Sequence, residues 1–167
     1  GGELWIGLPE SQEPRVSPMI GGLNAADDAS IDPAVKAMME QFMGPNSPGG
    51  QALSLNGAFG VDGAFNRRDV HAAEIPAANG ITNARSLARI YAATIGEVDG
   101  VRLLRSDTVD RARIKVTPEN EPDVCLIMPT TFGMGFMVHG MFSLFGGPGS
   151  FGHPGAGGSV AFALPEA

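Results

Sequence analysis

The sequence predicts an α+β protein in which helices come first and antiparallel strands follow. Helix-start and helix-stop signals gather before residue 114, whereas alternating apolar patterns joined by glycine-rich turns gather after it. A length of 167 residues with 43% hydrophobic content is ordinary for a globular protein. We therefore divide the chain into a helical part with long loops, residues 1–113, and a part built from antiparallel strands, residues 114–167.

Three kinds of segment are expected in the first 80 residues. Residues 4–8 predict a short strand, followed by a connection rich in proline. Asp32 and Pro33 form an N-cap and first-position pair that predicts a helix to about Met43, which Gly44-Pro45 would end. Residues 46–79 are rich in Gly, Ala and Asn with weak periodicity, so we predict a loop with room for one helical turn.

The clearest helix signal begins after Thr82, which can act as the N-cap, and ends at Gly96. Its apolar residues recur at the spacing of one helix face, with Arg85 and Arg89 outside it: Ala84, Leu87, Ala88, Tyr91, Ala92 and Ile95. A second, shorter helix is predicted from a cap at Ser106 to about Arg113, burying Val109 and Ala112.

The last third of the chain predicts two antiparallel strands and a glycine-rich connection. Residues 132–138 place apolar side chains at every second position, and residues 159–163 form the second apolar strand. Between them, residues 151–159 combine several glycines with His153, and we call this stretch the Gly–His segment. Glycine lets a backbone approach a ligand and histidine titrates near neutral pH, which favours one wall of an active site. The alternative is a tight hairpin connection in which glycine only satisfies the geometry of the turn.

Composition excludes several function classes. The chain has 11 Lys and Arg against 18 Asp and Glu, a net charge of −7, which argues against nucleic acid and against an anionic membrane surface. No apolar stretch reaches the roughly 18 residues that cross a bilayer. Cys125 is the single cysteine, so no internal disulfide forms, and its apolar neighbours predict a buried thiol. The compartment, cytoplasm or cell envelope, stays open.

Motifs for cofactors and metals fail on their context. Residues 147–152 match G-x-G-x-x-G, but a strand and not a helix is predicted to follow, so no dinucleotide site is expected. Residues 152–159 approach a P-loop, yet Gly158 occupies the position of the phosphate-binding lysine. His71, His139 and His153 have no Cys, His or carboxylate at ligand spacing, so we predict neither metal nor cofactor. We interpret His71 and His139 as structural or exposed residues.

Three segments taken together carry a family resemblance. Residues 74–89 (EIPAANGITNARSLAR), 132–136 (FGMGF) and 152–159 (GHPGAGGS) resemble, in order and spacing, the serine β-lactamase-related esterases, the branch akin to class C β-lactamases and penicillin-binding proteins. The resemblance extends over most of the chain. It implies a β-lactamase/D,D-peptidase-like α+β fold, of which this chain would form part of the helical lobe and part of the sheet. In that family a cleft between the two lobes joins S-x-x-K, Y-x-N and a K-T-G or H-x-G segment.

The third motif is the one that this sequence matches. The resemblance places His153 at the Lys or His position and Gly155 at the glycine. It implies that the Ala156 N–H forms half of an oxyanion hole, while His153 makes hydrogen bonds that polarise the site. Gly155 and Gly157 would leave room for the acyl group. A histidine here would be charged only below roughly pH 6.5, unlike a lysine.

The first two motifs have no counterpart. The nearest match to S-x-x-K is Ser86-Leu87-Ala88-Arg89, inside the predicted amphipathic helix, and arginine does not readily act as a base. Tyr91 is followed by two alanines, so Y-x-N is missing. We therefore predict that the 167-residue chain alone does not hydrolyse an ester. We expect the nucleophile and base to precede residue 1 in a longer polypeptide, and a last strand and helix to follow residue 167.

Three functional interpretations follow. The first is a piece of a carboxylesterase that acts through an acyl-enzyme, because H-x-G removes the permanent cation that favours the carboxylate of β-lactams. The second is a β-lactamase or D,D-peptidase of the same fold. The third is a non-catalytic homologue that uses the cleft only to bind a ligand. In the first two cases the partners are a small-molecule ester or amide and the remainder of the longer polypeptide.

Overall fold

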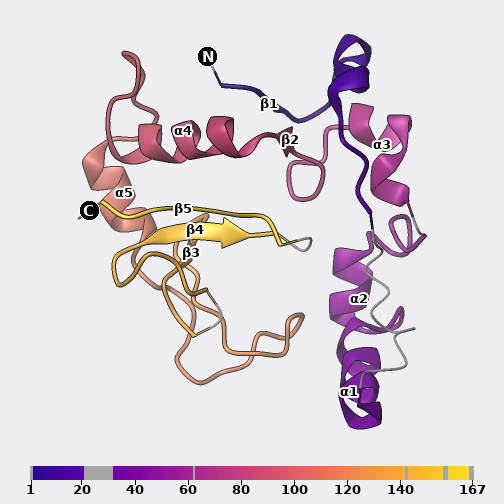
Figure 1. Cartoon of the computed structure of the whole chain (residues 1–167). Helices are drawn as coiled ribbons and strands as arrows, with labels where there is room; N and C mark the ends of the chain where they lie inside the picture. The colour runs from indigo at the N-terminus through magenta and orange to yellow at the C-terminus, as the bar shows by residue number, and fades with distance from the viewer. Residues whose placement is uncertain (1, 21–31, 62, 142, 156–157, 166–167) are drawn as a thin grey trace. The chain divides into compact units, whose positions relative to one another are not determined.

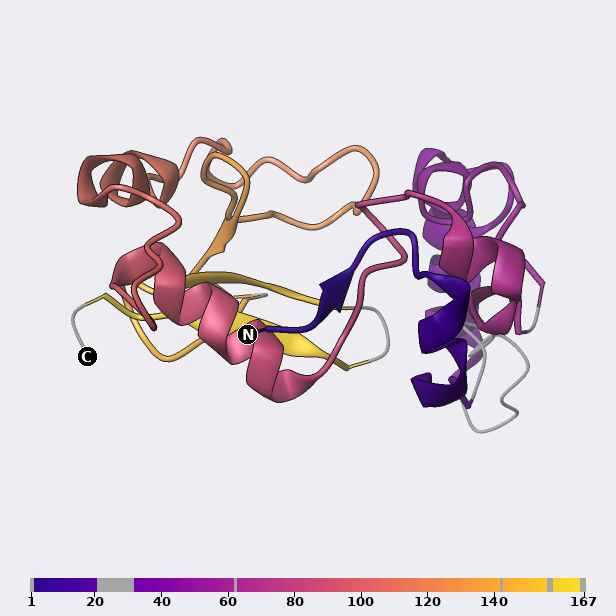
Figure 2. The same ribbon diagram turned by 90° about the horizontal axis from the view of Figure 1, so that it is seen from above.

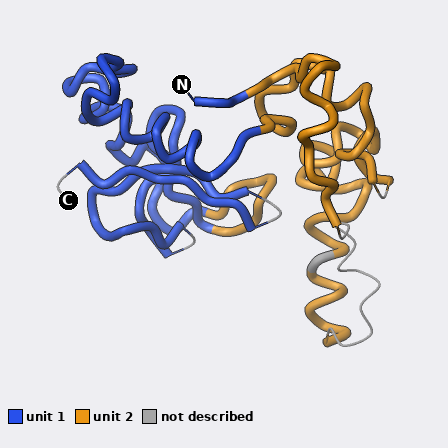
Figure 3. Tube along the Cα trace, turned by 45° about the horizontal axis from the view of Figure 1, so that its top comes forward, with its two compact units in different colours: residues 1–4, 82–121, 129–167 blue, residues 5–81, 122–128 orange. Residues whose placement is uncertain are grey.

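The computed structural model describes residues 2–20, 32–61, 63–141, 143–155 and 158–165. The chain divides into two compact units (Figure 3). Unit 1 contains Gly1–Leu4, Thr82–Glu121 and Pro129–Ala167, and unit 2 contains Trp5–Ile81 and Pro122–Met128. Helices and antiparallel strands occur together, which confirms the predicted α+β class (Figure 1). The division at residue 113 into helical and strand parts stays a prediction.

Unit 2 is helical in the part that the structure describes. It contains a 3-10 helix η1 (Glu10–Arg15), α1 (Pro33–Met43), α2 (Pro48–Leu53), a 3-10 helix η3 (Ala64–Asn66) and α3 (Arg68–Ala72). The prediction for α1 is confirmed, since Asp32 Oδ1 accepts a hydrogen bond of 2.7 Å from the Ala34 N–H and Pro33 is the first helical residue.

The predicted loop over residues 46–79 is wrong in its content, because α2, η3 and α3 all lie within it. Ser47 caps α2 by accepting a hydrogen bond from the Gly50 N–H at 2.9 Å. Gly49 and Gly50 have low helix propensity and no apolar side chain, so the sequence did not predict this helix. Close packing nevertheless requires glycine at both positions. A β-carbon at Gly50 would overlap the Gly44 carbonyl, and one at Gly49 would overlap the Cys125 carbonyl.

A small apolar cluster and a polar cluster stabilise unit 2. Phe59, Ala64 and Val70 form the apolar cluster, with Phe65 and Ile75 packed against it. Beside it, the His71 ring is buried, with Nδ1 2.8 Å from Glu13 Oε1 and Nε2 2.7 Å from the Phe65 carbonyl oxygen. The structural interpretation of His71 is therefore supported. Cys125 is half-buried, whereas the sequence predicted a buried thiol.

Unit 1 packs helices against a sheet. Its elements are α4 (Ala84–Ile95), α5 (Ser106–Ala112), β3 (Met137–Val138), β4 (Phe151–Pro154) and β5 (Val160–Ala163). The three strands form an antiparallel sheet in the order β3-β4-β5, and α4 packs against β5 (Figures 1 and 2). β1 (Leu4–Trp5) and β2 (Ile81–Thr82) form a two-stranded sheet where the chain passes from one unit to the other.

The helix starts in unit 1 differ from the predicted ones in detail. Asn83 and not Thr82 caps α4, since Asn83 Oδ1 accepts from the Ser86 N–H at 2.8 Å. The Thr82 hydroxyl instead donates to the Glu3 carbonyl oxygen at 2.6 Å. Ser106 is the first residue of α5 and not its cap, and no side chain caps that helix.

The packed face of α4 is also rotated from the predicted one. Leu87, Tyr91 and Ile95 are half-buried, but Ala84, Ala88 and Ala92 are exposed. Ser86, Ala93 and Thr94 are buried instead. The prediction for α5 is confirmed in that Val109 and Ala112 are both buried.

The predicted strand over residues 132–138 is shorter in the structure, where β3 contains only Met137 and Val138. Gly135 has a φ of 86°, which folds the segment so that Phe132 pairs with Met137 in an isolated bridge. β5 confirms the second predicted strand, but its partner is β4. The core of unit 1 contains Val109, Val138, Phe151 and Ala163, with Tyr91, Ile95, Leu104 and Phe136 packed around it.

No helix within the described ranges combines the length and apolar character that crossing a membrane requires.

Candidate functional site

The strand β4 runs from a buried end to an exposed one, and His153 lies at the exposed end. Phe151 and Gly152 are buried, whereas His153 is exposed. The ladder pairs His153 with Ala161 on β5. The sequence predicted His153 in the connection between two strands, but the structure places it on a strand, where the ladder fixes its backbone.

Two neighbours hold the His153 ring. The ring centroid lies 6.2 Å from that of Phe132, with 50° between the ring planes. His153 Nδ1 lies 2.6 Å from the Pro154 carbonyl oxygen. Phe132 is itself fixed, because its N–H donates to Thr117 Oγ1 at 3.2 Å and its carbonyl accepts from the Val116 N–H at 2.7 Å. The backbone around residue 132 therefore positions an aromatic wall for the histidine.

Gly155 begins the turn that joins β4 to β5. Its N–H donates to the Ser159 carbonyl at 2.6 Å, and its carbonyl accepts from the Gly158 N–H at 3.1 Å. Gly158 has a φ of 90°, a conformation that favours glycine. A β-carbon at Gly155 would overlap Ser159 Oγ. The hairpin geometry therefore accounts for Gly158, whereas at Gly155 the overlapping atom is a hydroxyl that can rotate away. A role of Gly155 in admitting an acyl group stays a prediction.

Ala156 and Gly157 lie outside the described residues. The predicted oxyanion-hole N–H of Ala156 consequently has no geometry here and stays a prediction. The structure places the other two predicted site residues, His153 and Gly155, close together at the end of β4.

Neither of the nearest substitutes for the missing motifs is poised for catalysis. Ser86 is buried, and its hydroxyl oxygen accepts a hydrogen bond from the Glu3 N–H at 2.9 Å. Arg89, at the position of the motif's lysine, pairs with Asp99. Tyr91 packs edge-on against Phe136 with ring centroids 6.4 Å apart, and burial raises the pKa of its hydroxyl. A raised pKa makes a tyrosine a poorer source of phenolate, the form that could act as a base.

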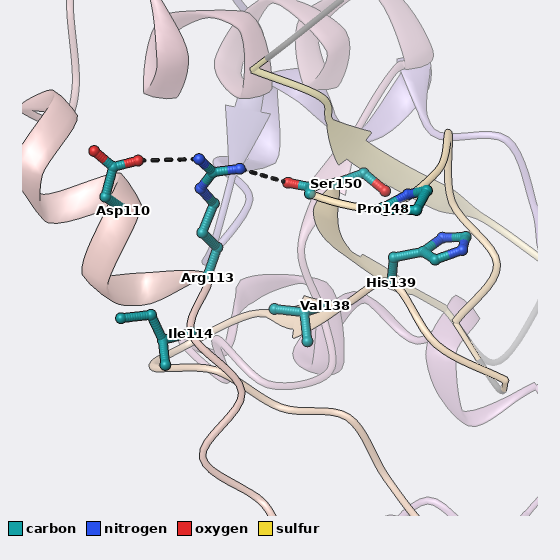
Figure 4. A pocket seen from close by; sticks show the side chains of 8 residues that line it. Asp110, Arg113, Ile114, Val138, His139, Pro148 and Ser150 are labelled. Atoms are coloured by element: carbon teal, nitrogen blue, oxygen red, sulfur yellow. Dashed lines mark hydrogen bonds and ion pairs between the residues drawn. The ribbon is translucent and has the colours of Figure 1, made fainter.

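A separate open pocket of about 460 Å³ lies elsewhere in unit 1 (Figure 4). The Arg113 guanidinium pairs with the Asp110 carboxylate at 3.2 Å and donates a hydrogen bond to the Gly149 carbonyl oxygen at 3.3 Å. The His139 ring lies beside Pro148, and its Nδ1 is buried with no hydrogen-bond partner in the described part of the chain. Asp110, Arg113, Ile114, Val138, His139, Pro148, Gly149 and Ser150 line the pocket, and His153 does not.

Sequence patterns missed this pocket. The spacing of Asp110 on α5 and Arg113 directly after it, three residues apart, is a local signal for their ion pair. The approach of His139 to Pro148 depends on the β3–β4 pairing, which the sequence did not predict. Within the described ranges, no three His, Cys, Asp or Glu side chains lie close enough together to hold a metal ion.

Comparisons with known proteins agree on one family. The chain is 36% identical over 170 aligned residues to esterase/beta-lactamase LipL of Mycobacterium tuberculosis, a match that covers 98% of this chain and 36% of LipL. The solved structure of EstA from Arthrobacter nitroguajacolicus Rue61a matches with a TM-score of 0.72 and 30% identity, over 99% of this chain and 41% of that one. The chain thus spans well under half the length of either relative. The beta-lactamase family model matches residues 2–167, and the chain therefore belongs to the beta-lactamase family.

Proposed function

We propose that this chain supplies the oxyanion-side wall of a serine hydrolase that cleaves carboxylic esters through an acyl-enzyme. The observation that supports this most directly is the exposed His153 near the end of β4, followed by Gly155 directly after the strand, an H-x-G sequence in a member of the beta-lactamase family. LipL is named as an esterase/beta-lactamase.

In the proposed reaction a serine hydroxyl attacks the ester carbonyl and the alcohol leaves. Water then attacks the acyl-serine and releases the acid. The carbonyl oxygen becomes negative in each tetrahedral intermediate, and a backbone N–H that already points at it lowers both barriers. We assign that N–H to Ala156, with Gly155 and Gly157 leaving space beside it. His153 contacts the substrate from the end of β4, just before that turn.

We infer that the serine comes from a longer polypeptide. Ser86 is buried, its hydroxyl is engaged by the Glu3 N–H, and its neighbour at the lysine position is an arginine in an ion pair. Because a serine needs an adjacent base to become nucleophilic, the 167-residue chain alone is proposed to be inactive.

A β-lactamase of the same fold is the second candidate, because LipL is named for that activity as well. An ester is favoured over a β-lactam by His153. Unlike lysine, an imidazole does not carry a permanent positive charge that would attract the β-lactam carboxylate.

Labelling with a fluorophosphonate probe tests the proposal. We expect the longer polypeptide to be labelled at a serine outside residues 1–167, and the 167-residue chain to stay unlabelled. Ser86→Ala in the longer polypeptide is the matched control and should be labelled like the wild type. Nitrophenyl butyrate and a cephalosporin then distinguish an esterase from a β-lactamase. A longer polypeptide that takes no label would contradict both enzymes and support a non-catalytic ligand-binding homologue.

A further inference from the structure

The hydrogen bond of the His153 ring determines which of its nitrogens carries the proton. Nδ1 lies 2.6 Å from the Pro154 carbonyl oxygen, and a carbonyl oxygen can only accept. The hydrogen at this contact must therefore be on Nδ1. Since a neutral imidazole has a single ring proton, Nε2 then carries a lone pair.

The described surroundings of the ring leave Nε2 free to meet a ligand. The other ring near it is that of Phe132, with centroids 6.2 Å apart and 50° between the planes, and this side chain offers no hydrogen-bond donor. His153 is exposed, and the described residues provide no hydrogen bond to Nε2. The strand pairing with Ala161 and the bond to Pro154 fix the backbone and the ring together.

We propose that His153 selects substrates as a hydrogen-bond acceptor, through the lone pair of Nε2. This inference rests on the function proposed above and names its substrate class: esters whose acyl part carries a hydroxyl, amide N–H or ammonium group close to the ester. A carboxylate in the same place has no hydrogen to donate, so it would face the Nε2 lone pair as a second acceptor and bind poorly. One well-formed hydrogen bond corresponds to about a tenfold difference in kcat/KM between otherwise matched esters.

Nitrogen NMR of the isotope-labelled 167-residue chain tests the tautomer without any enzyme activity. The spectrum is taken at about pH 8.5, where a histidine is ordinarily neutral. We expect His153 to show a protonated Nδ1 and an unprotonated Nε2, and His153→Gln assigns the signals by their loss. Pro154→Ala retains the carbonyl and should leave the tautomer unchanged. A proton on Nε2 in the wild type would overturn the inference, whatever the activity of the longer polypeptide.

Hydrolysis by the longer polypeptide tests the selectivity. The nitrophenyl esters of butyrate, hydroxybutyrate and succinate differ in one end of the acyl chain, which is a methyl, a hydroxyl-bearing group or a carboxylate. We expect hydroxybutyrate to be preferred over butyrate about tenfold, mainly through KM, with succinate the poorest. His153→Leu should remove the preference, and His153→Lys should reverse it towards succinate because a lysine only donates.

The two proposals fail in different ways. If butyrate is hydrolysed but all three esters react alike in the wild type, the acceptor role is overturned while the esterase proposal stands. If none of the esters is cleaved and no serine is labelled, both are overturned. If the tautomer and the ester preference both agree with expectation, both stand.

Discussion

At the scale of single residues, Gly152 shows how a paired strand restricts which residue its neighbour can hold. It pairs with Met137 on one side and with Phe162 on the other. A β-carbon there would lie 2.7 Å from Phe162 Cα and 2.6 Å from Phe162 Cβ, and it would overlap the Ala161 carbonyl. Backbone atoms cannot move aside as a flexible side chain can. No local pattern reveals this, because the crowding comes from the facing strand.

Gly152→Ala is therefore expected to lower the free energy of unfolding of unit 1 by about 3 kcal/mol, the upper end of the usual cost of overpacking. The control is Gly96→Ala at the end of α4, where a β-carbon meets only the Ala92 carbonyl at an ordinary 3.8 Å. That change should stay within about 0.5 kcal/mol. Urea unfolding followed by circular dichroism measures both variants. Equal losses would show that β4 and β5 can separate to admit a side chain.

Tyr91 predicts how stability depends on alkaline pH. Burial raises the pKa of its hydroxyl above the ordinary value of 10.0. Above about pH 10 the unfolded chain loses this proton while the folded chain keeps it, so stability falls as pH rises towards the folded pKa. Tyr91→Phe should remove this part of the decline. Because Tyr91 is the single tyrosine, phenolate absorbance reports it directly. Superimposable stability curves for wild type and variant above pH 10 would refute the prediction.

At the scale of elements, the sequence could predict those whose signals are local. Asp32-Pro33 gives the start of α1, and the apolar spacing of residues 84–95 gives α4. Ser47-Pro48 has the same cap signature and could have revealed α2, but the glycines that follow it weakened the pattern. β4 was missed as a strand because its glycine, histidine and proline do not alternate, and its pairing comes from two other strands.

The α4 cap is a case in which two adjacent residues could do the same task. Asn83→Ala should cost about 1 kcal/mol, because it removes the acceptor for the Ser86 N–H. Asn83→Ser should retain most of the stability, since serine caps as well as asparagine. Thermal and urea unfolding of the pair decide the matter. Serine and alanine variants of equal stability would mean that the cap contributes nothing.

At the scale of the whole molecule, the described residues contain one apolar cluster in each unit. Large apolar side chains remain exposed beyond them, among them Met141 and Leu144, which are 79% and 77% exposed. Such side chains mark a surface that binds other molecules when they form one contiguous patch, whereas scattered ones are ordinary in globular proteins. Composition predicted a globular protein with a hydrophobic interior, but which side chains stay outside depends on tertiary packing that no single segment encodes.

Leu144→Ser tests whether the exposed side chain of Leu144 belongs to such a patch. We expect it to reduce the binding of a hydrophobic fluorescent dye while changing the free energy of unfolding by less than about 0.5 kcal/mol. Val109→Ser is the buried counterpart, with 4% of Val109 exposed, and should cost about 2 kcal/mol or more. Dye fluorescence and urea unfolding are measured on both. A large destabilisation by Leu144→Ser would show that this side chain is packed in solution.

The contact between Glu13 and His71 has a consequence for the kinetics of folding. It joins residues 58 positions apart, and the Arg68 guanidinium reaches the Leu8 carbonyl over 60 positions at 2.8 Å. Closing such a loop loses chain entropy before the contact that offsets this loss can form. The hydrogen bonds of α1 and α3, in contrast, join residues that are close neighbours along the chain. The helices of unit 2 should therefore form early and the η1 segment should dock late. An interaction that forms after the transition state chiefly slows unfolding. The contact of the buried His71 with Glu13 should therefore lower the unfolding rate of unit 2 more than it raises the folding rate.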